Sequence, residues 1–575
     1  MAEKHTYGQI LKSSALIGGS SVLNIAIGIV RTKAMAILLG PSGVGLLGLY
    51  GSITDLTVSI VGMGINSSGV RQIAEAVGSG NTERIAKTAQ VLRRTAIFLG
   101  LLGAFFLFGF STQLSILTFG SDQHANGVAL LSIAVFFNLV SAGQGALIQG
   151  MRRISDLAKM GILGALFGTL ISIPIVYFLR EDGVVISLVL VAAMSLITSW
   201  WYRRKIHIET PSMTASEIGQ EQAALLKLGF AFMVSGLMVA GASYVVRLIV
   251  VRKVGFDAAG LYQAAWSLGG LYVGLILQAM GADFCPRLVA IAKDNAECNR
   301  VVNEQAHVSL LLAGPGVIAT LTFAPLILAL FYTTKFEGAV EILRWLCLGM
   351  TLRVIVWPIS FILIAKNVQK LFIFADLAWS VVYLGLAWVS VSSFNLKGAG
   401  IAFFGSYVFY VFMIYLIVWR LSGFRWSNAN IQTGFIFLAL IAVVFCSFYA
   451  LPPLLAMGVG TLAALLSGVY SIQVLLNLIS LDRIPLPLIK LLRWFRLTPG
   501  SNKYNELGPM VKISTGDIAF ENKPLVDIKR LIFTFMICTV FSMWAHWYEG
   551  AYGWSAGLES FESELKVLMS IFQRR

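Results

Sequence analysis

The chain has 575 residues, of which 57% are hydrophobic and only 12% are charged, whereas soluble domains usually carry about 25% charged residues. A water-soluble fold cannot bury this much apolar surface, so the composition excludes a soluble protein and predicts an all-α integral membrane protein. The formal net charge of +15 would suit nucleic acid binding, but the charges lie in short segments between apolar runs. That placement indicates membrane topology and no nucleic acid partner.

Apolar runs of spanning length recur along most of the chain. A transmembrane helix needs about 20 mostly apolar residues, and fourteen runs meet this requirement. They cover residues 13–39, 43–65, 95–118, 126–149, 158–179, 183–202, 226–251, 258–283, 308–332, 341–365, 371–392, 398–419, 432–451 and 454–480. The first run is too long for a cleaved signal peptide, so we expect a retained helix. A fifteenth run, 531–547, is shorter and ends in aromatic residues, so it either spans the membrane or lies in the interface.

Lysine and arginine are distributed unequally between alternate loops, which predicts the orientation. Clusters occur at 84–94, 152–159 and 203–205, on the same side as the N-terminus. The loops on the other side, before residue 431, carry only Arg180, Arg252, Lys253, Lys335 and Lys397. Because basic loops stay in the cytoplasm, we expect a multi-pass protein of a bacterial inner membrane with a cytoplasmic N-terminus.

A polar segment separates the first twelve spans into two sets of six. We expect an N-terminal lobe of TM1–TM6 over residues 1–202 and a C-terminal lobe of TM7–TM12 over 226–421. Between them, the Thr- and Ser-containing segment 203–225 suits a cytoplasmic inter-lobe linker. Residues 422–480 add TM13 and TM14, and 481–575 form a basic cytoplasmic tail that contains the fifteenth run.

Two stretches at equivalent places in these lobes hint at an internal repeat. Aligning residues 39–61 with 254–276 pairs Gly40 with Gly255, Gly45 with Gly260, Leu46 with Leu261, Ser52 with Ser267 and Val58 with Val273. Both copies start from the same side of the membrane. The repeat therefore predicts two parallel six-helix lobes, an arrangement common in transporters whose substrate path runs between the lobes.

Four basic residues inside the expected spans are candidates for substrate binding. Arg31 and Lys33 lie in TM1, Arg247 in TM7 and Arg353 in TM10. Such charges are costly and usually face a cavity or a partner. A cationic cavity suits an anion such as pyrophosphate, whose oxygens arginine binds with a bidentate fork. The alternative for the TM1 pair is a place near the outer end, where the side chains reach the headgroups.

Three acidic residues are candidates for ion coupling. Asp55 in TM2 either binds a coupling proton or cation or pairs with Arg31. Asp283 and Asp376 lie near the cytoplasmic ends of TM8 and TM11, where they either take part in coupling or are simply solvated.

The sequence contains no arrangement typical of an enzyme. None of the five cysteines forms a CxxC motif or has a histidine nearby, so no metal site is expected. A P-loop is also missing, so we expect no nucleotide and no cofactor. The short outer loops argue against a membrane-embedded O-antigen ligase or polymerase, which remains the alternative from a different class.

Three stretches resemble a known family. LLGPSGVGLLGLYGSITDL at 38–56, GLYQAAWSLGGLYVGLILQ at 260–278 and the segment 335–377 resemble Wzx-type polysaccharide flippases, most closely the O-antigen and lipid III flippases. These belong to the multidrug/oligosaccharidyl-lipid/polysaccharide exporter superfamily. The resemblance covers about residues 10–421.

The resemblance implies a flippase that works by alternating access and is coupled to an ion gradient. It implies a substrate of undecaprenyl pyrophosphate carrying an O-antigen-type oligosaccharide, moved from the cytoplasmic to the periplasmic leaflet, and cooperation with other polysaccharide assembly proteins. Lys33, Arg247 and Arg353 match cavity-lining basic positions of similar flippases. The acidic residues that lipid III flippases carry in TM8 and TM10 are replaced here by Gly270 and Met350. Alternatives are a lipid II flippase, a cation-coupled drug exporter and a non-transporting scaffold. The excess of intramembrane cations argues against the drug exporter.

Overall fold

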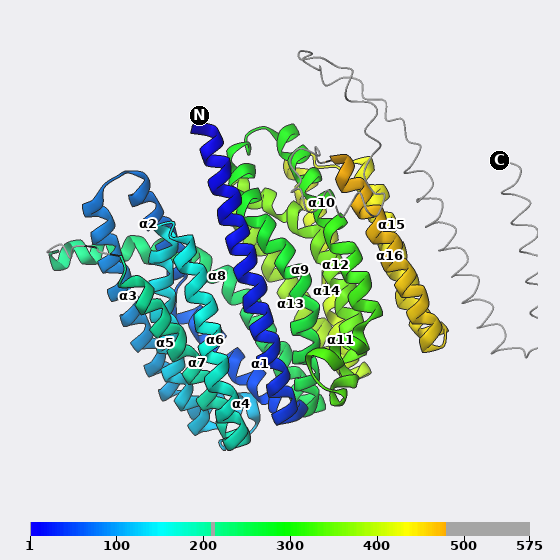
Figure 1. Ribbon diagram of the computed structural model, residues 1–575, viewed down its shortest axis with the longest axis horizontal. Helices are drawn as coiled ribbons and strands as arrows, with labels where there is room; N and C mark the ends of the chain where they lie inside the picture. The colour runs from blue at the N-terminus through cyan, green and yellow to red at the C-terminus, as the bar shows by residue number, and fades with distance from the viewer. Residues whose placement is uncertain (1, 207, 209–212, 479–575) are drawn as a thin grey trace, which may run out of the picture. The chain divides into compact units, whose positions relative to one another are not determined.

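The computed structural model describes residues 2–206, 208 and 213–478, and within these ranges it is helical with no strand (Figure 1). Eleven segments of the described residues are long and apolar enough to cross a membrane. Two of them, Ser20–Val61 and Ile154–Arg203, are long enough for two crossings each. The expected all-α membrane fold is therefore confirmed, whereas the fifteenth run and the basic tail lie outside the described residues.

The α-helices follow the expected spans closely. They are α1 (Ala2–Val61), α2 (Ile65–Gly78), α3 (Thr82–Gly109), α4 (Ser111–Phe119), α5 (Ala125–Gly150), α6 (Ile154–Leu179), α7 (Gly183–Arg203), α8 (Ala215–Val254), α9 (Phe256–Ala290), α10 (Asn295–Thr322), α11 (Ala324–Phe331), α12 (Val340–Ala365), α13 (Gln369–Phe394), α14 (Lys397–Ser422), α15 (Asn428–Ala450) and α16 (Pro453–Leu478). Two short 3-10 helices, η1 (Arg180–Asp182) and η2 (Thr334–Ala339), precede α7 and α12.

Glycine conformations divide the long helical stretches. Gly40 has φ 68° and ψ −169°, which breaks α1 into two halves that correspond to the expected TM1 and TM2. Gly255 has φ 113° and ψ 177° and separates α8 from α9. Backbone with such positive φ favours glycine because a side chain would clash there. The two joints predicted to be equivalent by the repeat therefore share one type of backbone conformation.

The helices group into two compact units, each described by itself. Among the described residues, the first contains those of 1–268, 325–346 and 369–410, and the second contains those of 269–324, 347–368 and 411–478. The unit boundaries fall within α9, α11, α12 and α14 and between α12 and α13. The division into lobes at 1–202 and 226–421 stays a prediction.

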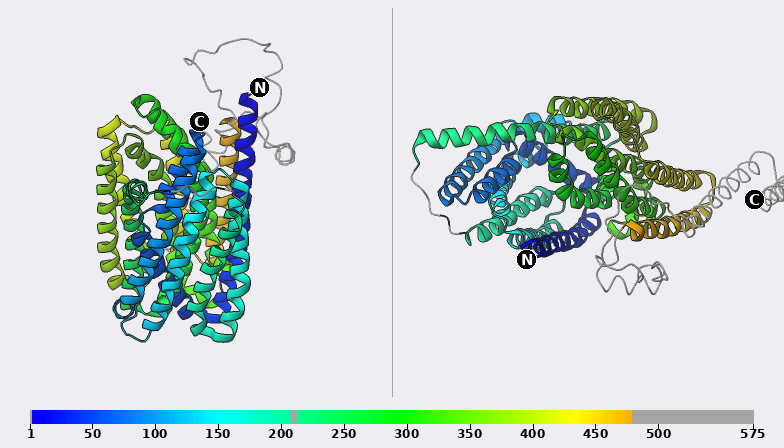
Figure 2. Two further views of the ribbon diagram at one scale, coloured as in Figure 1. Left: turned by 90° about the vertical axis from the view of Figure 1, so that its left-hand side faces the viewer. Right: turned by 90° about the horizontal axis from the view of Figure 1, so that it is seen from above.

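In the first unit, α3, α5, α6 and α7 run side by side, with α6 also against α1 (Figure 2). Small residues let the backbones approach closely, as is usual where lipid removes the hydrophobic drive for association. A Cβ atom added to Gly143 of α5 would lie 2.6 Å from the side chain of Ala96 in α3. Leu49, Val128 and Val135 belong to the apolar core that joins α1 to α5.

In the second unit, the two additional helices α15 and α16 pack against each other and against α10. The backbone N–H of Ser427 donates to Oδ1 of Asn303 (2.8 Å), and Nδ2 of Asn430 donates to the carbonyl of Asn303 (2.8 Å). Farther along α10, Nε2 of His307 lies 3.1 Å from the hydroxyl of Thr433. Polar residues of α10 thus find their partners on α15 and the linker before it.

Candidate substrate-binding site in the membrane

Arg247 is the best-defined of the candidate cations. It lies on α8, eight residues or about two turns before Gly255, and its side chain is half-buried. Its Nη1 group donates a hydrogen bond to the hydroxyl of Ser52 on α1. Its Nε group is buried without a hydrogen-bond partner among the described residues. A guanidinium that is held in place but incompletely paired is suited to accept an anionic ligand.

Two tyrosines lie close to this guanidinium. The hydroxyls of Tyr262 in α9 and Tyr383 in α13 are 3.2 Å apart, and both side chains are fully buried. Arg247 interacts electrostatically with both. The tyrosine rings pack on neighbouring aromatic residues, with Tyr383 stacked on Trp379 at a centroid distance of 5.4 Å. These contacts make one rigid wall beside Arg247.

Asp55 lies one turn beyond Ser52 on the same helix. Asp55 is exposed, and its charge interacts with that of Arg247. The described residues show no direct ion pair between Asp55 and any cation. The alternative in which Asp55 pairs with Arg31 is therefore not observed. The alternative in which Asp55 is an ion-coupling site stays a prediction.

Lys33 and Arg31 occupy the first half of α1. Nζ of Lys33 donates to the carbonyl oxygen of Ala329 in α11 (2.6 Å). Arg31 is half-buried and has no hydrogen bond or ion pair within the described part of the chain. Oδ1 of Asn24, seven residues earlier, is buried and likewise has no partner there. The lysine is thus anchored to backbone, whereas Arg31 and Asn24 are not.

The remaining candidate residues are Asp376, Arg353 and Asp283. Asp376 on α13 accepts a hydrogen bond from the hydroxyl of Tyr410 on α14 (3.0 Å), so it has a structural partner. Arg353 belongs to the second unit, is half-buried in α12 and shows no hydrogen bond to a described residue. The side chain of Asp283 lies outside the described residues. The structure brings together Arg247 and Asp55 but does not join the other candidates by direct contacts.

Sequence analysis missed three residues of this site, namely Ser52, Tyr262 and Tyr383. Ser52 carried a weak signal, because it lies three residues before Asp55 and belongs to the repeat. The tyrosines carried no signal, since buried tyrosine is common in any membrane helix. Their pairing joins residues that are 121 positions apart.

The positions of the two replaced acidic residues are adjacent in the second unit. A Cβ atom added to Gly270 would lie 3.7 Å from the methyl group of Met350. Carboxylates at both positions would face each other, whereas this chain places an apolar contact there.

Comparison with known proteins assigns the chain to a family. A family model described as polysaccharide biosynthesis protein matches residues 34–341, which is more than half of the chain. The chain belongs to this family. A second family model, which describes one component of ammonia and methane monooxygenases, matches residues 512–574. That stretch lies outside the described residues and is too short a part of the chain to show a family.

Two curated relatives match most of this chain over nearly their whole length. The chain is 21% identical over 438 residues to the lipid III flippase of Escherichia coli (strain K12), covering 72% of this chain and 99% of that protein. The lipid III flippase of Shigella flexneri gives the same identity and coverage.

Solved structures show the same fold. An inward-facing multidrug resistance MATE family transporter of the MOP superfamily has a TM-score of 0.58 at 13% identity and covers 70% of this chain and 99% of its own. An inward closed structure of the lipid II flippase MurJ has a TM-score of 0.55 at 14% identity and covers 80% and 98%. The expected exporter-superfamily fold is therefore confirmed for this polysaccharide biosynthesis protein.

Proposed function

We propose that the protein is a flippase that moves an undecaprenyl-pyrophosphate-linked oligosaccharide of O-antigen type across a bacterial inner membrane. Transfer runs from the cytoplasmic to the periplasmic leaflet by alternating access, with no covalent reaction, and serves other polysaccharide assembly proteins. The family and the lipid III flippase relatives support a lipid-linked sugar as the substrate class.

The observation that carries the proposal is the incomplete hydrogen bonding of the Arg247 guanidinium. Holding an arginine at bilayer depth costs about 2.5–3.5 kcal/mol on insertion scales. In the described structure a neutral hydroxyl, that of Ser52, is its hydrogen-bond partner, and Nε is unpaired. A pyrophosphate would supply the missing acceptors and offset the charge.

Lys33 lies at the corresponding level of the repeat. It precedes Gly40 by seven residues, as Arg247 precedes Gly255 by eight. Two cations at corresponding places in the two repeats suit the two phosphates of a pyrophosphate. Arg31 and Arg353 are proposed to assist. Among the described residues, Lys33 has one hydrogen bond, to the carbonyl of Ala329, so two donors of its ammonium group are left for the ligand.

Ion coupling is proposed to use Asp55. It is exposed and senses the charge of Arg247, so a bound anion would change its proton affinity. Asp376, which Tyr410 holds, and Asp283 are secondary candidates.

A transport assay tests the function directly. The full-length protein is reconstituted in liposomes with undecaprenyl-pyrophosphate-linked oligosaccharide or with lipid II, and exposure of the sugar on the opposite leaflet is followed. We expect transfer of the first lipid and loss of transfer in Arg247→Ala. Transfer of lipid II alone would favour the second candidate, a lipid II flippase, which the 80% coverage by the lipid II flippase structure supports. Transfer of neither lipid by correctly inserted protein would contradict both.

A further inference from the structure

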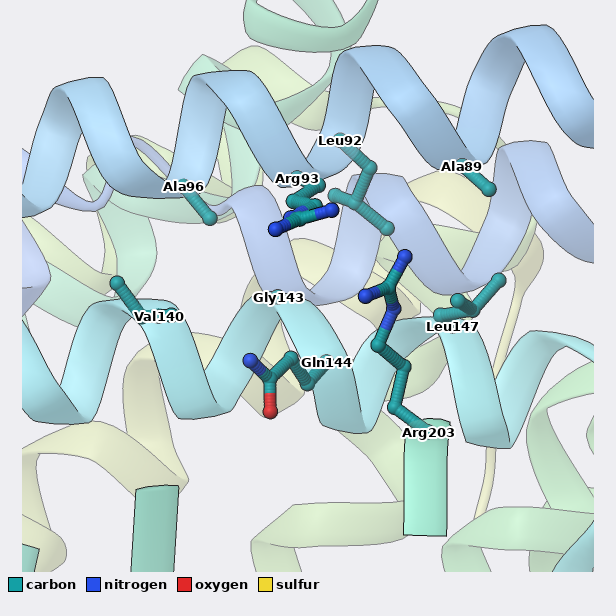
Figure 3. A pocket seen from close by; sticks show the side chains of 9 residues that line it. All are labelled: Ala89, Leu92, Arg93, Ala96, Val140, Gly143, Gln144, Leu147 and Arg203. Carbon is teal, nitrogen blue, oxygen red and sulfur yellow. The ribbon is translucent and has the colours of Figure 1, made fainter. Parts of the chain in front are cut away.

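Two arginines outside the candidate site converge on a small pocket of the first unit. Arg93 of α3 and Arg203, the last residue of α7, line this pocket together with Gln144 of α5. Figure 3 shows both guanidinium groups directed into the space between α3 and α5. The charge distribution predicts that this end of the helices is cytoplasmic.

Neither guanidinium has a counter-charge among the residues that the structure describes. Two other cations at this end do have one, since Arg153 pairs with Asp156 at 2.7 Å and Lys87 pairs with Glu83 at 2.8 Å. In contrast, the side chains of Arg93 and Arg203 form no hydrogen bond or ion pair with any described residue, and their charges are close enough to repel each other. An anion between them would remove this repulsion.

Gln144 adds a neutral donor to the pocket. Its Oε1 atom accepts a hydrogen bond from the hydroxyl of Ser199 (2.8 Å). That bond fixes the amide and leaves the Nε2 group to donate. Two guanidinium forks and one amide are the donors that a phosphate group requires.

The surroundings place the pocket at headgroup depth. Trp200 and Trp201, just before Arg203, are 43% and 57% exposed, and tryptophan gathers at the membrane interface. Beyond Arg93, α3 presents Phe98, Leu101 and Phe105 as an apolar stripe that is between 57% and 73% exposed. This stripe lies on the side of α3 opposite Ala89 and Leu92, which line the pocket, so it is the tryptophans that place the pocket at the membrane interface.

We propose that Arg93, Arg203 and Gln144 bind the phosphate of an anionic phospholipid at the membrane interface. Basic pockets between membrane helices on the cytoplasmic side are known to take such headgroups. The bound lipid would tie the ends of α3, α5 and α7 together. The site uses none of the residues assigned to the transported lipid, so it stands independently of the proposed function.

Lipid retention tests the site. Full-length protein is purified from nanodiscs that contain phosphatidylglycerol and phosphatidylcholine, and the phosphatidylglycerol retained is measured by native mass spectrometry. Arg93→Gln with Arg203→Gln should lower the affinity at least about tenfold, since charge-assisted hydrogen bonds are lost. The matched control is Arg204→Gln, because Arg204 lies at the same end but stacks over the ring of Trp200 at 4.5 Å. This control should retain phosphatidylglycerol as wild type does.

Further variants and measurements distinguish the possible results of the lipid-retention experiment. Arg93→Lys with Arg203→Lys keeps the charge but loses the forks, so it should retain an intermediate amount, and thermal unfolding in phosphatidylcholine should show that each variant is folded. Equal retention by wild type and the glutamine variant would overturn the proposal. So would binding of inorganic pyrophosphate that depends on both arginines while phosphatidylglycerol does not bind, because the pocket would then take a soluble phosphate or the pyrophosphate of the transported lipid.

Discussion

At the scale of single residues, Gly270 and Met350 bear on how transport is driven. The resemblance implies a carboxylate at each position, and the structure shows that these positions touch. Two carboxylates in contact would share a proton, which is a common basis for proton coupling. An apolar pair cannot do this. Any coupling in this protein must therefore use another group, of which Asp55 beside Arg247 is the best placed.

His124 gives a residue-scale prediction for acid stability. Its Nδ1 lies 3.1 Å from the hydroxyl of Tyr50, and its ring packs on Phe119. Burial lowers the pKa of His124 below its ordinary value, and the charge of Glu181 opposes this. Because the folded pKa is lowered, the neutral form is favoured, and stability is lost as pH falls below about 6.5, the pKa of an unperturbed histidine. Thermal unfolding between pH 8 and pH 5 should show this loss.

Two variants check the His124 prediction. His124→Phe keeps the ring packing without a titrating group, so its melting temperature should fall less in acid than that of wild type. Glu181→Gln removes the opposing charge and should make the acid sensitivity greater. An identical pH dependence in wild type and His124→Phe would refute the assignment.

At the scale of elements, the two glycine joints meet. A Cβ atom on Gly45 would lie 2.6 Å from the carbonyl oxygen of Phe256, and one on Gly260 would overlap the carbonyl of Pro41. Gly48 in turn faces Gln263, its partner in the repeat. The second half of α1 and the start of α9 thus cross at equivalent residues, as two related elements do around a local two-fold axis.

This crossing predicts a sharp difference between two glycine variants. Gly260→Ala should destabilise the protein by about 1–3 kcal/mol, the usual cost of overpacking, because the rigid carbonyl of Pro41 cannot move aside. Gly51→Ala is the control, since a Cβ atom at Gly51 meets nothing within 4 Å. Thermal unfolding in detergent measures both. Equal melting temperatures for Gly260→Ala and wild type would contradict the close crossing.

The additional helices α15 and α16 give a second element-scale prediction. Because the resemblance to flippases ends near residue 421, the sequence predicts that both helices are peripheral to transport. The structure shows α10 bonded to α15 through Asn303 and His307. Truncation after Leu421 would expose these polar side chains, which is costly in lipid. We therefore expect lower membrane abundance but continued export per inserted molecule. Normal abundance with complete loss of export would show that the pair forms part of the path.

The sequence predicted the helices better than the contacts between them. Apolar runs identify spans because lipid requires about 20 such residues. They do not show that TM1 and TM2 join directly at a kink at Gly40, or that a break at Phe323 separates α10 from α11. Arg247 could be predicted as a site residue because a charge inside a spanning helix is costly. Its bond to Ser52, 195 positions away, depends on how helices pack, and packing leaves no local pattern.

At the scale of the whole molecule, the topology is testable by labelling. In a variant without the native cysteines, of which Cys446 is exposed, single cysteines replace the exposed residues Glu83, Ser216 and Gln123. A membrane-impermeant maleimide added to whole cells should label Gln123→Cys and also Ser121→Cys, but neither of the others. Labelling of Glu83→Cys and Ser216→Cys alone would mean that the charge-based orientation is inverted.

The central claim is that Arg247 binds the pyrophosphate of a lipid-linked oligosaccharide during transport. The decisive measurement is the amount of surface polysaccharide in a flippase-null strain that expresses each variant, corrected for membrane abundance. Arg247→Ala should abolish export, Arg247→Lys should retain part of it because the charge remains, and Arg353→Ala should resemble Arg247→Ala. Lys227→Ala, which removes an exposed cation of the same helix, should export normally. Normal export by Arg247→Ala and Arg353→Ala at wild-type abundance would contradict the cationic site.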